Sequence, residues 1–379
     1  MHRKDAIAWV VSVCSVSLRL SQAKTLSILV AAAMRVQRVS LANIGRMMDG
    51  CVKHQIKRCW RFCANERVET ADAMRGIVAQ LLKKRGKKKK LLIAVDWVDI
   101  KGFQTLLASV VLKGRSTPIA WASTTNHVYD GHRSRNAFEE SLLLVLREMI
   151  PRTIKVVILA DRGFGRTALA TFCQQQGFGY VIRIQPSVTV RLHGFHGQLL
   201  DYPVYKGIAK VLKRVSYRSD GAVTQNVVVH WRRNLPKKRD ECWFLMTDQP
   251  GSAHQLCNLY GRRMTIEQLF RDDKSKRNGW SLRDTKITKP DRLDRLLLIL
   301  AIAYLLLCGI GLIAKQQFTP SAWCSTNRDI ECSIYTIGLI MLDKIDASPP
   351  EAFAAVIELS ESVSPNWGWG AAIVFGDRW

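Results

Sequence analysis

The stretch LLIAVDWVDI, residues 91–100, is the segment on which the fold of this chain depends. Its run of apolar residues before Asp96 predicts a strand that is buried inside a sheet. A second run of the same kind, VVILAD at 156–161, ends in Asp161. A charged residue at the end of a buried strand lies at the rim of the sheet, where α/β proteins place ligand sites. Both aspartates are therefore candidate site residues, although acidic residues can also simply terminate strands.

The segments around these two strands predict a mixed α/β sheet. Their patterns indicate two strands at 103–114 and 116–125 and an amphipathic helix at 136–150. A helix closed by Gly177 at 167–177 and a further strand at 180–184 follow. Residues 186–245 then become β-rich and basic, with a turn at Asp220-Gly221, and are typical of an inserted β domain.

The charge of the chain points to a polyanionic partner. Its 379 residues contain 57 Lys and Arg against 31 Asp and Glu, a formal net charge of +26 that is spread over the whole length. Such a balance favours nucleic acid or an anionic membrane surface. Binding to DNA phosphates would weaken with salt by about 0.9 log unit per neutralised phosphate for each decade of salt concentration.

Residues 1–85 are predicted to be all-helical. Ser40 opens one helix, Asp49-Gly50 makes a turn, and a second helix carries basic residues at Lys53, His54, Lys57, Arg58 and Arg61. A short helix, a glycine turn and a basic helix are typical of a helix-turn-helix that reads the DNA major groove. The alternative is an ordinary helical bundle with a solvated basic face. The run KKRGKKKK at 83–90 then marks a basic linker.

The ten cysteines lie at irregular spacings, so they predict reduced thiols in an intracellular protein rather than a disulfide framework. The nearest approach to a metal cluster is Cys51, His54, Cys59 and Cys63, which lacks a CxxC pair. Buried thiols explain this spacing better than a zinc site does.

Two segments imitate membrane signals. The basic and apolar N-terminus is interrupted by Asp5 and by serines, and no small-residue cleavage site follows it. Residues 296–314 carry no charge and have spanning length. We favour a helix buried on all sides in a large core, because an amphipathic stretch runs into it and Gly309 and Gly311 weaken its end.

The segment YGRRMTIEQLFRDDK, residues 260–274, places one glutamate among arginines and a lysine. At about 100° per residue on an ideal helix, Tyr260, Arg263, Glu267 and Lys274 fall within roughly 60° of one another. A surface pair between Arg263 and Glu267 alone would be worth about 0.3–0.5 kcal/mol. That pair does not explain why a phenol and a second cation lie on the same edge. The neighbouring apolar stripe, which can dock the helix on the sheet, is Leu259, Ile266, Leu269 and Phe270.

A dinucleotide site is the rival interpretation of VVILADRGFGRTALA, because it reads as a strand, a GxGxxA pattern and a helix. The Asp-Arg pair before Gly163 lies where the tight turn would begin. No ribose-binding acid follows at the expected distance, so a nucleotide cofactor is not expected.

The spacing Tyr-x2-Arg-x3-Glu-x6-Lys resembles the signature around the third acid of DDE transposases of the insertion sequence four type. LADRGFG resembles the second-acid motif of that family, and AVDWVDI fits the first. The 106 positions between Asp161 and Glu267, filled by a β-rich segment, are also typical of the group. The resemblance covers roughly residues 90–315.

The resemblance implies a ribonuclease H-like fold in which Asp96, Asp161 and Glu267 bind two Mg²⁺ or Mn²⁺ ions about 3.5–4 Å apart. It implies that Tyr260, Arg263 and Lys274 hold transposon-end phosphates. In hairpin-forming relatives a tryptophan stacks on a flipped base. Trp243 is the matching position and Trp231 is the alternative, although a core tryptophan would look the same.

Three further acids lie close enough to the motif to confuse the assignment. Asp99 falls on the opposite face from Asp96 if the strand continues. Asp272 and Asp273 lie about 140° and 120° of helix rotation from Glu267.

The resemblance therefore implies a cut-and-paste transposase that acts on double-stranded DNA, both transposon ends and target, as a homodimer in a synaptic complex. It would work in the bacterial cytoplasm at the nucleoid and not in a membrane. The alternatives are a nuclease or resolvase of the same fold, and an inactive DNA-binding derivative. The expected parts are a helical DNA-binding region at 1–85, a first core part at 86–185 and a β-rich insertion at 186–245. A second core part at 246–315 and a helical C-terminal region for oligomerisation at 316–379 follow.

Overall fold

The computed structural model describes the protein at residues 1–36, 38–83, 90–112, 115–125, 134–217, 224–231, 242–274, 280–282, 285–325 and 332–361. The predicted basic linker at 83–90 and the predicted turn at Asp220-Gly221 lie largely or wholly outside these residues.

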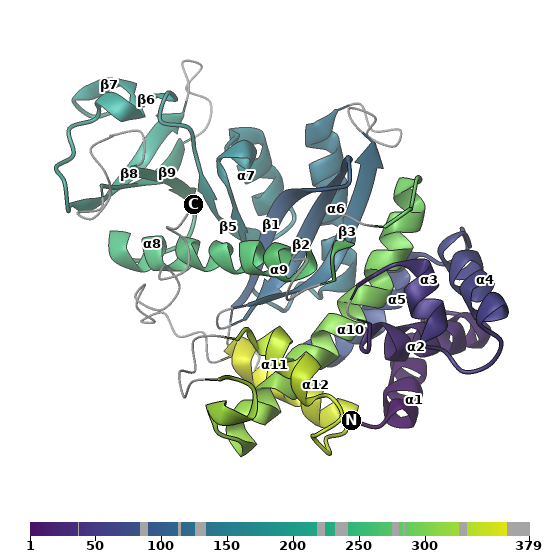
Figure 1. Ribbon diagram of the computed structural model, residues 1–379. Coiled ribbons are helices and arrows are strands. Elements are labelled where there is room, and N and C mark those ends of the chain that lie inside the picture. Colours follow the sequence, from purple (N-terminus) through teal and green to yellow (C-terminus); the bar gives the residue numbers. More distant parts are fainter. Residues whose placement is uncertain are drawn as a thin grey trace.

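A single mixed sheet forms the centre of the protein, as predicted (Figure 1). Its strand order is β3-β2-β1-β4-β5-β10-β9-β8-β6-β7. The strands β1, β4 and β5 are parallel to one another, and the other pairs are antiparallel. The bounds are β1 (Leu91–Ile100), β2 (Phe103–Val111), β3 (Ser116–Thr125), β4 (Val156–Ala160), β5 (Phe178–Arg183), β6 (Thr189–Leu192), β7 (Phe195–Gln198), β8 (Ala209–Tyr217), β9 (Thr224–His230) and β10 (Trp243–Thr247).

The β-rich segment does not build a separate sheet. Its last strand, β10, pairs with β5 through Leu245 and Arg183, and β9 then continues the sheet on the other side of β10. The strands β8, β6 and β7 extend this same edge (Figure 1). The segment is therefore bonded directly to the strands that lead to the candidate site.

The N-terminal residues are helical, as predicted. Ser40 caps α3 by accepting a hydrogen bond from the backbone of Asn43, and Gly50 makes the following turn with a φ of 101°. The bounds are α1 (Arg3–Cys14), α2 (Leu20–Ala33), α3 (Leu41–Arg46), α4 (Val52–Cys63) and α5 (Thr70–Lys83).

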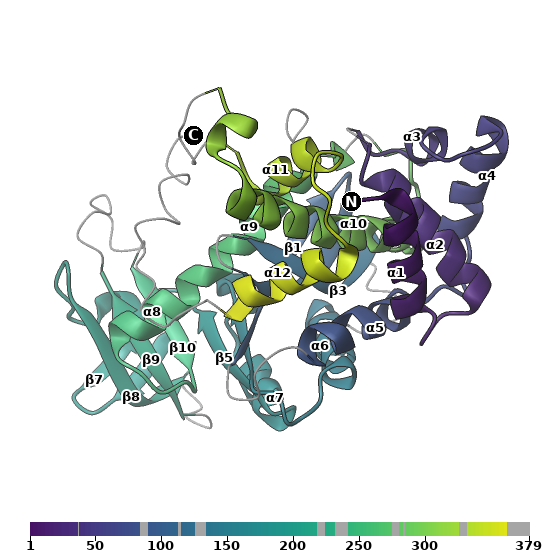
Figure 2. The same cartoon turned by 90° about the horizontal axis from the view of Figure 1, so that it is seen from below.

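Helices cover both faces of the sheet (Figure 2). One face carries α6 (Arg135–Met149) and α7 (Thr167–Gln175), and the other carries α9 (Thr265–Lys274) and α10 (Pro290–Gln317). The helices α11 (Ile334–Met341) and α12 (Pro349–Glu361) pack against α10. The remaining described elements are α8 (Ala253–Gly261) and the 3-10 helices η1 (Arg162–Phe164), η2 (Leu199–Asp201), η4 (Arg262–Met264) and η6 (Pro320–Ala322).

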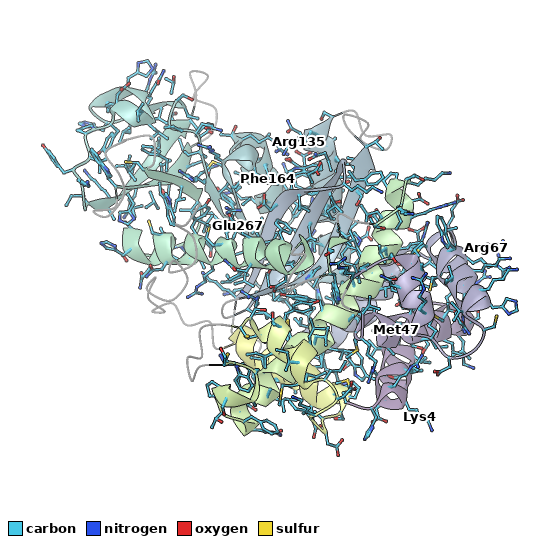
Figure 3. The ribbon with its side chains drawn as sticks, in the orientation of Figure 1. Lys4, Met47, Arg67, Arg135, Phe164 and Glu267 are labelled. Carbon is cyan, nitrogen blue, oxygen red and sulfur yellow. The ribbon has the colours of Figure 1, made fainter. Side chains whose placement is uncertain are left out.

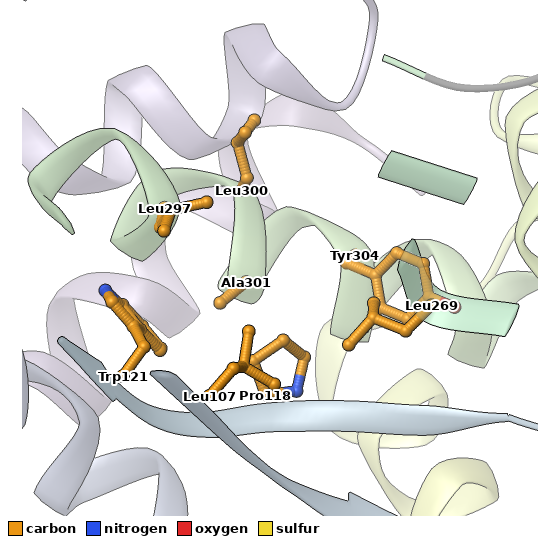
Figure 4. Close-up of a pocket in the computed structure, with 8 residues that line it drawn as sticks. All are labelled: Leu107, Pro118, Trp121, Leu269, Leu297, Leu300, Ala301 and Tyr304. Atoms are coloured by element: carbon orange, nitrogen blue, oxygen red, sulfur yellow. The ribbon is translucent and has the colours of Figure 1, made fainter. Parts of the chain in front are cut away.

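The apolar helix α10 is a core helix. It is long and apolar enough to cross a membrane, but 94% of its most apolar window is buried inside the protein. Gly309 and Gly311 allow α12 and α11 to approach, because a Cβ at these positions would lie 2.2 Å from the Ala352 carbonyl and 2.0 Å from the Ile334 carbonyl. The glycines that we expected to weaken the helix therefore allow its closest packing. Its other side meets the sheet across a small apolar cavity, lined by Leu107, Pro118, Trp121, Leu269, Leu297, Leu300, Ala301 and Tyr304 (Figure 4).

All ten cysteines are reduced thiols, and most of them are buried. Burial raises the pKa of four thiols to about 12, at Cys14, Cys59, Cys63 and Cys173. Cys51 is exposed. The candidate zinc spacing thus combines one exposed thiol with two buried ones, and within the described residues no group of three metal-ligating side chains is close enough to hold an ion.

Candidate active site

The sheet brings Asp96 and Asp161 together, although only Asp161 follows the end of its strand. Asp96 was expected to end a strand but lies inside β1, where the pairing of β1 with β4 ends and its pairing with β2 continues. The strands β1 and β4 are parallel neighbours, and Val95 is in register with Ala160. Asp96 and Asp161 each follow one of these residues, so they reach the same level of the sheet on adjacent strands. The negative charge of Asp161 contributes to a raised pKa of Asp96, which agrees with this closeness.

Asp161 begins a tight turn into η1, where its Oδ1 accepts a hydrogen bond of 2.8 Å from the backbone of Gly163. A Cβ on Gly163 would lie 3.0 Å from that oxygen, and one on Gly165 would lie 2.9 Å from the carbonyl of Arg183. The two glycines of the GxG pattern therefore let this loop pack against its own aspartate and against β5. Close packing accounts for them without a nucleotide.

The helical segment that carries Glu267 departs from the ideal helix expected from the sequence. After α8 the chain makes the 3-10 turn η4, from Arg262 to Met264, before α9 begins at Thr265. Both arginines of this turn are buried. The ideal rotation per residue therefore does not hold between Tyr260 and Glu267, because a 3-10 turn is wound more tightly than an α-helix. Glu267 lies in the first turn of α9, in front of the sheet (Figure 3).

Arg263 joins the first and third acids of the predicted triad. Its Nη1 donates to Asp96 Oδ2 at 2.8 Å, and its Nη2 donates to Glu267 Oε1 at 2.8 Å. The contact with Asp96 spans 167 positions of sequence, so it fixes η4 and α9 on the rim of β1. The expected helical pair of Arg263 with Glu267 is therefore present, and the structure adds a bridge to Asp96 that the sequence did not predict.

Burial has the largest effect on the electrostatics of this cluster, and the charges of Arg263 and the carboxylates follow. Burial raises the pKa of Asp96 to about 6; Arg263 opposes the rise, and the charges of Asp161 and Glu267 add to it. Burial alone would lower the pKa of Arg263, but Tyr260, Asp96 and Glu267 outweigh it and the pKa is raised. One guanidinium thus faces three carboxylates.

The donor set suits a hard divalent cation, since carboxylate oxygens are the ligands that Mg²⁺ and Mn²⁺ prefer. The pKa of Asp96 is raised chiefly by its burial, and the neighbouring charges of Asp161 and Glu267 add to the rise. In the present arrangement Arg263 pairs with the oxygens of Asp96 and Glu267 that a cation would use. Within the described residues, no group of three acidic, histidine or cysteine side chains is close enough to hold a metal ion in this arrangement.

Tyr260 lies inside the protein, under Arg263. Its ring is buried, packs edge-on against Trp243 with centroids 4.9 Å apart, and lies 5.9 Å from the Arg263 guanidinium. Burial raises the pKa of the phenol. Trp243 is partly buried against the core, as is Trp231 on the adjacent strand end. The structure therefore places Tyr260 and Trp243 as a packed pair beneath the arginine.

The other acids near the motif have contacts of their own. Asp99 is exposed and accepts hydrogen bonds from Gly102 and Gln104 in the β1–β2 turn. Asp272 is buried, pairs with Arg115 at 3.1 Å and accepts a hydrogen bond from Tyr304 at 2.9 Å. Both acids serve local structure away from the Arg263 cluster. The side chains of Asp273 and Lys274 lie outside the part of the chain that the structure describes.

The basic residues predicted on the second N-terminal helix divide into two groups. Lys53, Lys57 and Arg61 are exposed, recur every four residues along α4 and are called the α4 stripe below. His54 is exposed beside them. Arg58 is half-buried and donates to the Thr25 hydroxyl at 3.4 Å, so it contacts the protein rather than only solvent.

One group near the two aspartates was not predicted from the sequence. Glu139 is buried on the apolar face of α6, three and four positions before Leu142 and Leu143. An acid on the apolar face of an amphipathic helix is the signal that could have identified it. Glu139 accepts hydrogen bonds from Trp97, beside Asp96, and from Arg166, in the segment that follows Asp161. These contacts join elements that only the folded chain brings together.

Comparison with known proteins adds one finding. A family model described as "Transposase DDE domain" matches residues 87–306, which is more than half of the chain. Among curated proteins, none matches this chain significantly.

Proposed function

The chain belongs to the family of transposase DDE domains, and from this premise we propose that it is a cut-and-paste transposase. It would cleave DNA at the ends of its own mobile element and join those ends to target DNA. The observation that carries the proposal is the meeting of Asp96 and Glu267 on one arginine, beside Asp161, at the rim of parallel strands.

The three acids are assigned as the metal ligands. Asp96, Asp161 and Glu267 would hold Mg²⁺ or Mn²⁺, which would activate a water or a DNA 3′-OH and stabilise the oxygen that leaves phosphorus. The order of the strands supports a ribonuclease H-like core. An antiparallel β3-β2-β1 unit is joined there to parallel β4 and β5.

Arg263 is assigned a role in holding the DNA backbone. A cation at the acids would neutralise the carboxylates with which Arg263 now pairs, so its guanidinium would be free to take two oxygens of a phosphate. The Tyr260 ring, which packs on Trp243, lies under the guanidinium of Arg263. In this arrangement Tyr260 acts through Arg263, and Lys274 supplies a second cation. A base stacked on Trp243, or on Trp231, would require Trp243 to leave Tyr260 or Trp231 to leave the core.

DNA ends would be bound by the N-terminal helices and by the strands β6–β9. The α4 stripe presents three cations at a spacing that suits successive backbone phosphates beside a groove. We assign the helical region to 1–85, the insertion to 186–245, the core to 86–185 and 246–315, and an oligomerising part to 316–379. Two copies would pair the two ends in a synaptic complex, at the bacterial nucleoid.

The test is incubation of the purified protein with labelled element-end DNA, with and without Mg²⁺ or Mn²⁺. A metal-dependent nick at the element boundary is expected, and it should be lost in Asp96→Asn, Asp161→Asn and Glu267→Gln while end binding is kept. Joining of the 3′-OH end to a target plasmid distinguishes a transposase from a nuclease that only cuts. Bound ends without any metal-dependent nick would contradict the proposal and favour an inactive DNA-binding derivative.

A further inference from the structure

Glu139 is a carboxylate in an unusual place. It lies in the second turn of α6, and its side chain is only 2% exposed. A buried carboxylate is costly unless hydrogen bonds and opposite charges compensate it. Its partners therefore explain why an acid occupies this position.

The first partner comes from the strand of Asp96. Trp97 follows Asp96 on β1, so its side chain points to the opposite face of the sheet, toward α6. The indole Nε1 donates to Glu139 Oε1 at 2.8 Å, and the ring stacks on Phe138 with centroids 5.6 Å apart. Arg135 covers the same ring at 4.8 Å and donates to Oε1 at 3.2 Å. Trp97, the neighbour of Asp96 on β1, is thus in contact with three side chains of α6.

The second partner comes from the loop of Asp161. Arg166 lies five positions after Asp161, immediately before α7, and donates to Glu139 Oε2. The same guanidinium also donates to the Asn136 carbonyl at 3.3 Å and to Glu140 at 3.4 Å. This end of the loop is therefore clamped onto the start of α6.

The two oxygens of one carboxylate thus serve two different segments. Oε1 is bonded to the strand that carries Asp96, and Oε2 is bonded to the loop that carries Asp161. We propose that Glu139 is a positioning residue that fixes the spacing of these two aspartates from behind the sheet. The assignment of the aspartates as metal ligands rests on the function proposed above. Groups that orient the ligands of a metal commonly change its affinity by about 10–100-fold when they are removed.

An ordinary stabilising ion pair would behave differently, and the same helix contains one. Glu148 is exposed on α6 and pairs with Arg75 at 3.2 Å. Like Glu139, it is a glutamate on α6 that pairs with an arginine, but that arginine belongs to neither the strand of Asp96 nor the loop of Asp161. Glu148→Gln is therefore the matched control for Glu139→Gln.

The experiment compares the full-length wild type with Glu139→Gln, Trp97→Phe and Glu148→Gln in two measurements. The first is the Mn²⁺ concentration that gives half-maximal cleavage of element-end DNA. The second is amide hydrogen exchange of the metal-free and DNA-free protein. For Glu139→Gln we expect the Mn²⁺ midpoint to rise about tenfold, with faster exchange confined to residues 95–98 and 161–166. For Glu148→Gln both measurements should stay within about twofold of wild type, as for an exposed pair.

The proposal is overturned if Glu139→Gln leaves the Mn²⁺ midpoint and the exchange of both segments at wild-type values. If Glu139→Gln instead speeds exchange throughout the protein, Trp97→Phe decides. That variant keeps an aromatic ring and leaves the pairs of Glu139 with Arg135 and Arg166, but it removes the hydrogen bond from the indole. An unchanged midpoint and unchanged exchange at 95–98 would overturn the proposal. If the wild type cleaves no DNA with any metal, the proposed function fails, while hydrogen exchange still tests the role of Glu139.

Discussion

Replacing Arg263 with alanine should expose how strongly the acidic cluster depends on one guanidinium. The side chain of Arg263 is 9% exposed and that of Asp96 is 16% exposed, so their contact is a buried ion pair. Removal of one partner of such a pair costs about 3–5 kcal/mol, because the remaining charge is left buried and uncompensated. Glu267 is 39% exposed, so its contact adds only about 0–1 kcal/mol. We expect Arg263→Ala to lower the free energy of unfolding by about 3–5 kcal/mol at pH 8 without metal.

The loss should depend on pH in a defined direction. The pKa of Asp96 is raised to about 6, so the folded state binds this proton more tightly than the unfolded chain does. Ionisation of Asp96 therefore costs stability as the pH rises through that range. Without Arg263 the pKa of Asp96 rises further, so the difference between variant and wild type should be largest above pH 7 and shrink toward pH 5. Mn²⁺ should stabilise the variant more than the wild type, because the cation no longer competes with a guanidinium.

The assay is urea unfolding, followed by tryptophan fluorescence, at pH 5 and pH 8 with and without Mn²⁺. Arg75→Ala is the control, because Arg75 also bridges two carboxylates, Asp72 at 3.0 Å and Glu148 at 3.2 Å, but is 41% exposed. The control should change the free energy of unfolding by less than about 1 kcal/mol. An Arg263→Ala variant as stable as this control at pH 8, or a loss that does not vary with pH, would refute the reasoning.

Three further predictions concern the DNA surface, the Asp161 loop and the thiols. Alanine at all three positions of the α4 stripe should make the logarithmic salt dependence of end binding shallower by about 2.7, at about 0.9 per lost phosphate contact; an unchanged slope in a salt titration would exclude this surface. Gly165→Ala would place a Cβ 2.9 Å from the Arg183 carbonyl and so displace the loop of Asp161. DNA cleavage should then fall at least about tenfold, as for a misplaced catalytic group, while end binding is kept. Full cleavage by this variant would contradict the packing. At pH 8 a thiol reagent should label Cys51 in the folded protein but not the four buried thiols whose pKa is about 12, and rapid labelling of those four before unfolding would contradict their burial.

Local patterns predicted the elements of this fold well. The apolar runs before Asp96 and Asp161 form neighbouring parallel strands. Ser40 caps α3, and Gly50 makes the turn between α3 and α4, as the sequence indicated. These features depend on residues a few positions apart, such as strand alternation, helix caps and glycine turns. The long uncharged helix was also interpreted correctly as a core element rather than a membrane span.

Contacts between distant elements could not be predicted in this way. The bridge from Arg263 to Asp96 spans 167 positions, and the 3-10 turn that shapes it is a response to tertiary packing rather than to local propensity. The burial of Tyr260 against Trp243 likewise requires β10 to join the sheet beside β5. Glu139 shows the same limit in part. Helical periodicity places it on the apolar face of α6, but its hydrogen-bond partners Trp97 and Arg166 lie on two other elements.

The central claim is that Asp96, Asp161 and Glu267 form one metal centre, and a crystal of the protein grown with Mn²⁺ tests it most directly. Anomalous scattering from manganese locates the ion independently of the protein phases. We predict manganese about 2.1 Å from a carboxylate oxygen of each of Asp96, Asp161 and Glu267, with Arg263 moved away from Asp96 and Glu267. Manganese bound elsewhere, with Arg263 still bridging Asp96 and Glu267, would contradict the account.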